Sequence, residues 1–265
     1  MKARRILVLL LCIFSVSFVG CSTIALSHLR KGDDYQRQMQ WDKAIEEYTL
    51  AIKADADCAK AYSNRGWAYF LRAWTYRNEE ARLKDLDQAI ADCTKAIELD
   101  NEIAVVYNTR CACYLEKGYF DKTYFDDAII DSSKAIELDP AYETAYNTRV
   151  WAYSETDRCD EAIADCTKAI QLNPRFSALY QTRGACYLEK GMYEQTVTDC
   201  TKAIELDPEF DPEFDVPYLT RGQAYLKLGK VSEAGKDLET FIKISENEQL
   251  IELARRLLGG SDSQH

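Results

Sequence analysis

The chain has 265 residues, of which 29% are charged and 47% are hydrophobic, which is enough to build a sizeable core. Five prolines and eleven glycines are too few for a disordered chain or an all-β fold. The formal net charge of −11 argues against nucleic acid as a partner, because phosphate binding needs a basic stripe that the sequence lacks.

The first 20 residues have the features of a secretory signal peptide. Basic residues precede an apolar run of 14 residues, Ile6–Val19, which is too short to cross a bilayer as a helix. The ending Phe18–Cys21 resembles a bacterial lipobox, which implies that Cys21 is lipidated and becomes the first mature residue. The alternatives are an ordinary signal peptide with an incidental Cys, or an uncleaved anchor. A lipid would attach the chain to a bacterial membrane, facing the periplasm, and Ser22 favours the outer membrane.

A nine-residue motif recurs downstream and sets the organisation of the chain. Asp92–Asp100 reads Asp-Cys-Thr-Lys-Ala-Ile-Glu-Leu-Asp, and similar copies occupy Asp131–Asp139, Asp165–Asn173 and Asp199–Asp207. The offsets of 39, 34 and 34 residues indicate a repeat array. Each copy is typical of the last turns of a helix, because three copies are followed by a Pro, which cannot continue a helix.

Aligned on this motif, the chain divides into six helical hairpins, and residues 249–265 follow as a capping helix and a frayed tail. The hairpins are expected at about 25–58, 59–103, 104–142, 143–176, 177–210 and 215–248. A small residue at each crossing lets two helices approach closely, and tyrosines fill the space beside it. Each hairpin has an apolar face that only its neighbour can cover, so stability accumulates along the array.

This pattern resembles the tetratricopeptide repeat family, with an aromatic residue at position 4, a small residue at 8, Tyr at 11, Ala at 20 and 27, and Pro at 32. The resemblance covers nearly all of residues 21–248. It implies an all-α, right-handed superhelical solenoid of six hairpins that holds a peptide or partner protein on its concave face. The last repeat departs from the pattern, with Phe241 at position 27.

A second departure is that position 7 carries a cation and position 23 an acid in every repeat. The cations are Lys31, Arg65, Arg110, Arg149, Arg183 and Arg221, and the acids are Glu47, Asp92, Asp131, Asp165, Asp199 and Asp237. We predict an ion-pair ladder within each hairpin or between adjacent hairpins, because a buried cation without a partner would be costly. The alternative is a row of arginines that binds a ligand.

The second and third hairpins are longer than the period. About eleven extra residues lie between Tyr69 and Ala89, and about five lie around Tyr119–Asp126. The first insertion contains no Gly or Pro, so it is expected to extend both helices without a break. Both insertions lie at the turn inside a hairpin, where they form either a binding face or longer turns packed on their neighbours.

The chain has ten cysteines. Five of them, Cys93, Cys113, Cys166, Cys186 and Cys200, recur at core positions of stacked hairpins. Equivalent positions are about 8–10 Å apart or more, which exceeds the disulfide reach of about 7 Å between Cα atoms. They are predicted to be free and buried. An exported chain could carry one bridge involving Cys58, Cys111 or Cys159. His28 and His265 are the only histidines, and the sequence offers no catalytic set, metal site or cofactor site.

The inner face of the first helices is the candidate binding surface, and its amides, hydroxyls and two indoles suit an extended peptide. The residues are Asn64, Trp67, Asn108, Thr109, Asn147, Thr148, Trp151, Gln181, Thr182 and Gln223. The alternative is a groove that only water fills. The family's clamp for chaperone C-termini is absent, because Leu29, Val105 and Thr109 stand where the clamp needs cations.

We therefore expect a non-catalytic interaction scaffold, anchored by lipid at Cys21, that binds a protein or peptide partner during assembly of an envelope complex. The alternative is an accessory subunit of a periplasmic solute transport system that binds a substrate-binding protein or a small hydrophobic ligand. An enzyme is disfavoured, because the sequence lacks a nucleophile with a matching base.

Overall fold

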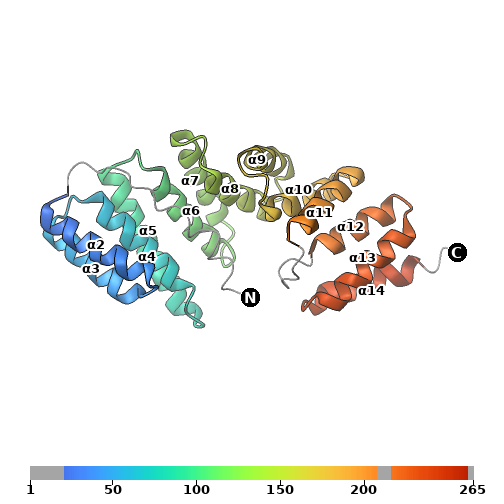
Figure 1. Cartoon of the computed structure of the whole chain (residues 1–265), viewed down its shortest axis with the longest axis horizontal. Coiled ribbons are helices and arrows are strands. Elements are labelled where there is room, and N and C mark those ends of the chain that lie inside the picture. The colour runs from blue at the N-terminus through green and yellow to red at the C-terminus, as the bar shows by residue number, and fades with distance from the viewer. Residues whose placement is uncertain (1–20, 208–215, 262–265) are drawn as a thin grey trace. The chain divides into compact units, whose positions relative to one another are not determined.

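The computed structural model describes residues 21–207 and 216–261, which form thirteen α-helices and no strand (Figure 1). The predicted all-α fold class is confirmed. The expected signal peptide at residues 1–20, the linker at 208–215 and the last four residues lie outside the described residues. The chain forms two compact units, here called the first unit (residues 21–152) and the second unit (residues 153–261). Each is described by itself.

The first unit contains three helical hairpins. They are α2 (Thr23–Arg37) with α3 (Trp41–Ala54), α4 (Ala59–Ala73) with α5 (Glu79–Leu99), and α6 (Ala104–Gly118) with α7 (Tyr124–Leu138). Helix α8 (Glu143–Glu155) begins in this unit and crosses its boundary. The helices pair because each presents small residues to the next, with the fully buried rings of Tyr48, Phe70 and Phe125 filling the crossings.

Two glycines in this unit show how close the crossings are. A Cβ added at Gly32 would lie 2.4 Å from the Tyr48 ring, and one at Gly118 would lie 2.4 Å from the Phe125 ring. Neither glycine can therefore carry a side chain without moving an aromatic ring. The predicted role of small residues at the hairpin crossings is confirmed at these two positions.

The first insertion does not extend both helices, and that prediction is wrong. Helix α4 ends at Ala73, and residues 74–78 form a turn before α5 begins. The turn forms because the Asn78 side chain caps α5, with its Oδ1 accepting a hydrogen bond from the Ala81 N–H at 3.0 Å. The insertion thus lengthens only α5, which reaches 21 residues.

The second unit contains α9 (Cys159–Leu172), α10 (Ser177–Glu189), α11 (Tyr193–Leu206), α12 (Val216–Lys227), α13 (Val231–Ile244) and α14 (Glu248–Ser261). Helix α14 packs on α13 as the predicted cap. Its Ile251 and Ala254 are buried against Leu238 and Phe241, and Glu252, Arg255 and Arg256 on its other side are exposed. Phe241 is fully buried in this contact, so its replacement of the family's Ala serves the cap.

The capping helix does not end at Gly259-Gly260 as expected, and continues to Ser261. Gly259 does not adopt the positive φ that a glycine C-cap requires, and helical glycine is tolerated at a modest cost. The positive φ angles in the described backbone lie instead in the turns inside hairpins, at Gly191, Gly229, Met39 and Asp157. Among the described helices, none has both the length and the apolar character needed to cross a membrane.

Candidate functional site

Buried ion pairs fix the two helices of four of the hairpins that carry the candidate stripe. Arg65, Arg110, Arg183 and Arg221 each donate from Nε and Nη2 to both oxygens of one carboxylate, at 2.6–2.9 Å. The acceptors are Asp92, Asp131, Asp199 and Asp237, whose side chains are 4–9% exposed. Bidentate geometry of this kind combines strength with direction. The predicted ladder is confirmed in these four hairpins.

These four arginines and Arg149 also bind the hairpin before their own, which the sequence reasoning did not foresee. The Nη1 atoms donate to hydroxyls at 2.9–3.1 Å, in the pairs Arg65–Thr49, Arg110–Thr94, Arg149–Ser133, Arg183–Thr167 and Arg221–Thr201. The signal was present in the sequence, because a Thr or Ser follows the recurring acid by two residues in every one of these repeats. One guanidinium therefore joins three helices.

The first hairpin is an exception, and the expected pair of Lys31 with Glu47 is wrong. Lys31 is exposed, and the Glu47 carboxylate lies 2.7 Å from Nδ1 of His28. A lysine presents a single hydrated ammonium rather than a planar fork, which favours the solvent-exposed position that Lys31 adopts.

The electrostatics of the ladder favour a structural role over a ligand-binding row of arginines. Burial by itself lowers the pKa of Arg110, but the hydrogen bonds and charge of Asp131 outweigh it and the net pKa is raised. The guanidiniums also lie 5.7–5.9 Å from the ring centres of Tyr62, Tyr107, Tyr146, Tyr180 and Tyr218. These five arginines are thus already engaged by groups of this chain.

Three residues of the predicted stripe face neighbouring helices instead of a groove. Asn108, Thr109 and Thr148 are only 3–6% exposed. The Thr148 hydroxyl on α8 donates to Oδ1 of Asn108 on α6 at 2.9 Å, and Thr109 donates to the Val105 carbonyl. The Thr148–Asn108 bond joins the first helices of the fourth and third hairpins, and the Thr109 bond stays within α6. We therefore correct the expectation that these three side chains are open to a partner.

Asn64 is half-buried and belongs to a polar cluster in the first two hairpins. Its Nδ2 donates to Oδ1 of Asp33 at 2.8 Å, and the hydroxyl of Tyr48 donates to the same oxygen at 2.8 Å. Burial and the Asp33 charge raise the pKa of Tyr48, so the hydroxyl stays a donor. A partner would have to compete with these bonds for Asn64, and its place in a binding site stays a prediction.

Trp67, Asn147 and Trp151, like Asn64, are stripe residues of the first unit that keep accessible surface. The Trp67 ring stacks on Phe70 with 5.4 Å between ring centres, and Trp151 packs beside the buried residues of the third hairpin. In the described part of the chain, the buried Oδ1 of Asn147 has no hydrogen-bond partner. Buried acceptors are rarely left in this state, which sets this oxygen apart from the other stripe amides.

The second unit carries the other three stripe residues, Gln181 and Thr182 on α10 and Gln223 on α12. All three are half-buried. They present two amides and a hydroxyl, which can both donate to and accept from a peptide backbone.

The two insertions contact each other at one edge of the first unit. Arg82 on the long α5 lies 3.8 Å from the Glu116 carboxylate and 5.2 Å from the centre of the Phe120 ring. Nζ of Lys117 donates to Asp87 at 2.6 Å. These contacts favour the interpretation of longer turns packed on their neighbours, although Tyr119 and Phe120 remain 46% and 44% exposed.

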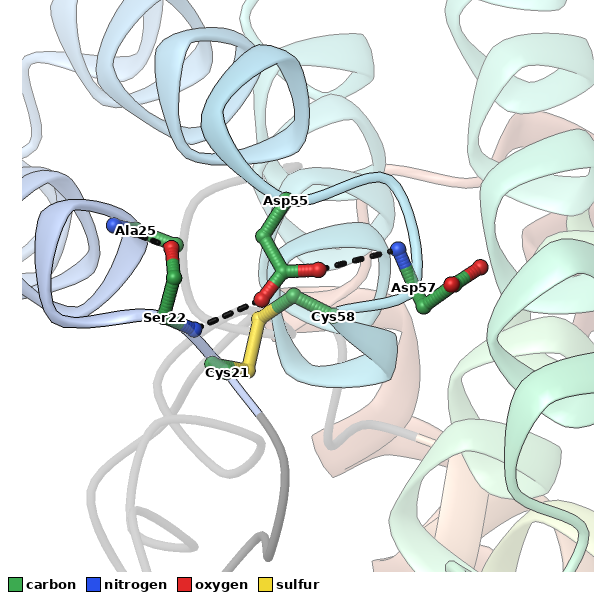
Figure 2. Close-up of a disulfide and its surroundings, with 6 residues drawn as sticks. All are labelled: Cys21, Ser22, Ala25, Asp55, Asp57 and Cys58. Carbon is green, nitrogen blue, oxygen red and sulfur yellow. Dashed lines mark hydrogen bonds between the residues drawn. A yellow bond between two sulfur atoms is a disulfide. The ribbon is translucent and has the colours of Figure 1, made fainter.

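Most of the described cysteines are free and buried as predicted, and one disulfide is present. Cys93, Cys111, Cys113, Cys166, Cys186 and Cys200 are free and buried, and Cys159 is free and half-buried. Cys58 forms a bridge, as one of the alternatives expected, and its partner is Cys21 (Figure 2). The sequence reasoning missed this partner because it assigned Cys21 to a lipid.

Comparison with protein families gives matches over most of the described chain. Models described as "Tetratricopeptide repeat" match residues 143–176, 177–210 and 217–248. A model described as "Uncharacterized protein conserved in bacteria" matches residues 23–136. Hsp70-Hsp90 organizing protein 3 of Arabidopsis thaliana is 28% identical over 100 residues, which are 38% of this chain and 16% of that protein. The segments matched in curated relatives span 12–21% of those relatives' own length.

Solved structures share the fold at low sequence identity. The crystal structure of YrrB, titled "a TPR protein with an unusual peptide-binding site", has a TM-score of 0.61 at 20% identity and covers 79% of this chain and 97% of its own. The crystal structure of PilW, titled "widely conserved type IV pilus biogenesis factor", has a TM-score of 0.66 at 14% identity and covers 88% and 98%. At this identity the likeness concerns the fold.

Proposed function

The chain is a tetratricopeptide repeat protein, and from that premise we propose that it is a non-catalytic scaffold that binds an extended peptide or a partner protein through the stripe residues within each unit. The stripe consists of Trp67, Asn147 and Trp151 in the first unit and of Gln181, Thr182 and Gln223 in the second. A fold built of stacked helical hairpins typically carries binding surfaces rather than catalytic centres.

The observation that carries this proposal is the unpartnered Oδ1 of Asn147. A buried acceptor without a partner costs about 1–3 kcal/mol, and a peptide N–H placed there would remove that cost. Trp151 lies one helical turn further along α8 on the same side, where its half-buried indole offers apolar area to an adjacent side chain. Amide next to indole is a combination that suits a peptide backbone with one large anchoring residue.

Attachment through a lipid at Cys21 and a place in the bacterial envelope, periplasm-facing, form the finer part of the proposal. The support is the lipobox-like sequence, the match to a model conserved in bacteria, and a fold neighbour whose title concerns pilus biogenesis. The partner would then be a subunit of an envelope complex whose assembly the scaffold assists.

The experiment compares partner capture by the full-length chain and by two variants in cells treated with a crosslinker. Asn147→Ala with Trp151→Ala removes the acceptor and the indole of the first unit. Ile130→Ala is the matched control, since Ile130 is an apolar residue of the same unit that is 65% exposed on α7. Loss of the pair should reduce capture by about tenfold or more, as for interface hot spots, while the control retains it.

Equal recovery of the partner by all three chains would contradict the proposal. The melting temperature of the double variant is measured alongside, so that lost binding is not confused with unfolding.

A further inference from the structure

The sulfur of Cys21, which the proposed anchor would use, is already bonded within the described chain. Cys21 precedes α2, and Cys58 ends the turn between α3 and α4 (Figure 2). Their sulfurs are joined with 4.9 Å between the Cα atoms, and Cys58 is 1% exposed. The bridge therefore closes the first hairpin on itself, and its Cys58 half is shielded from solvent.

Asp55 holds both ends of this bridge in place without any covalent bond. Its Oδ2 accepts a hydrogen bond from the Ser22 N–H at 2.6 Å, which fixes the residue next to Cys21. Its main-chain carbonyl accepts from the Cys58 N–H at 3.3 Å, and its Oδ1 accepts from the Asp57 N–H at 3.2 Å (Figure 2). One aspartate thus orders the turn that carries one cysteine and the segment that carries the other.

The start of α2 supports the same arrangement. The Ser22 hydroxyl accepts from the Ala25 N–H at 3.3 Å and caps the helix. Once α2 and α3 pair, Cys21 is brought to Cys58 by the fold, which raises the local concentration of one thiol around the other.

We propose that Cys58 competes with the lipid for the sulfur of Cys21, so that folding of the first hairpin removes the lipid site. The protein then exists in two covalent forms, a lipid-anchored form with Cys58 as a free thiol and an unanchored form closed by the disulfide. The lipid arm of this proposal rests on the anchor put forward under the proposed function, and the disulfide arm rests on the geometry alone.

The chemistry of the two forms excludes their coexistence in one molecule. A thioether to lipid uses the sulfur of Cys21, which then has no valence for a second sulfur. In the other form the two thiols lose two protons and two electrons as the S–S bond forms. The electrons reduce the disulfide of a thiol oxidant to two thiols, and oxidants of this class act in exported compartments.

The test is made on the full chain expressed in a bacterium that lipidates exported proteins. Membrane and soluble pools are separated, free thiols are blocked with an alkylating agent, and intact masses are measured for wild type, Cys58→Ser and the control Cys159→Ser. We expect the unlipidated wild-type chain to carry no alkyl group on Cys21 or Cys58. We expect Cys58→Ser to raise the lipidated share at least twofold, and Cys159→Ser to leave it unchanged.

Growth of the wild type with a membrane-permeant reductant is the second arm, which does not depend on how Cys58→Ser folds. It should raise the lipidated share in the same direction. An alkylated Cys58 in the unlipidated pool would overturn the disulfide, and an unchanged lipidated share in both arms would overturn the competition. Absence of lipid from every chain would overturn the anchor and the competition together, while peptide binding through the stripe would be unaffected.

Discussion

Arg110 and Asp131 face each other across the third hairpin, with Nε and Nη2 of the arginine donating to both carboxylate oxygens at 2.7 and 2.8 Å. The third nitrogen donates to Thr94 of the hairpin before, at 3.0 Å. The same geometry recurs in other repeats. Neighbouring hairpins within each unit are therefore held in a defined orientation by the hydrogen bonds of these arginines, as well as by apolar contact. This rigidity keeps the stripe residues of a unit at constant spacing, as a scaffold for an extended peptide requires.

Replacement of Arg110 by Met should destabilise the protein by about 3–5 kcal/mol, because it leaves the carboxylate of Asp131 buried without its cation. Urea unfolding of the two chains gives the difference. The double variant Arg110→Met with Asp131→Leu should recover most of the loss, since neither charge remains. A single variant within about 0.5 kcal/mol of wild type would show that the pair does not hold the hairpin.

Replacement of Met39 by glycine should increase the stability of the protein. Its φ of 57° lies in the left-handed region, in the turn where two other hairpins place Gly191 and Gly229. A side chain in this region costs about 1–2 kcal/mol, and Met39 recovers little of it because it is 59% exposed. We expect Met39→Gly to raise stability by about 1 kcal/mol and Met39→Ala to leave it nearly unchanged, as measured by urea unfolding. Equal effects of the two substitutions would contradict the backbone explanation.

Two glycines should respond to alanine in opposite ways. Gly118→Ala should destabilise by about 1–3 kcal/mol, because the new Cβ falls 2.4 Å from the Phe125 ring. Gly235 lies inside α13 with nothing within 4 Å of the new Cβ, so Gly235→Ala should stabilise by up to about 1 kcal/mol. Thermal unfolding of both variants gives the signs, and a loss at Gly235 would refute the reasoning.

Stability should fall in alkaline solution as buried thiols ionise in the unfolded chain. Burial raises the pKa of Cys111 from 9.0 to about 12. Because the folded pKa is the higher one, this contribution is present below pH 9 and is lost as the pH rises from about 9 towards 12. The loss is about 1.4 kcal/mol per pH unit within that window.

The control for this pH dependence is Cys111→Ala, which has no thiol at that position. The stability difference between wild type and Cys111→Ala should shrink by about 1 kcal/mol between pH 9 and pH 10, because the unfolded thiol is already half ionised at pH 9. A difference that does not change with pH would mean that Cys111 does not titrate in this way.

The architecture could be predicted from the sequence because the same structural residues recur in each repeat. Most repeats carry a small residue, a tyrosine and an arginine–aspartate pair at the same positions. A helix boundary that is ambiguous in one repeat can therefore be placed from the others. The failures fall where copies differ. Lys31 lacks the fork of an arginine, and Asn78 caps α5, so that the insertion lengthens one helix where two were expected to lengthen.

The candidate site was harder to predict, because the position of a residue in the repeat does not determine whether its side chain packs against a neighbouring helix or stays accessible. Asn108 and Thr148 share a face with Asn147 in sequence register, yet they are buried against each other while Oδ1 of Asn147 has no partner in the described residues. Cys21 and Cys58 are separated by 37 residues and occupy no equivalent repeat positions, so only the fold could pair them.

Site-specific photocrosslinking in cells tests whether the stripe residues contact the partner. A photoreactive phenylalanine analogue is placed at Trp151 or Gln223 on the stripe, and at Ile130 or Glu239 on exposed faces of second helices in the same units. We predict an adduct with one common partner from both stripe positions and none from the other two. Adducts from Ile130 or Glu239 with none from the stripe would contradict this prediction.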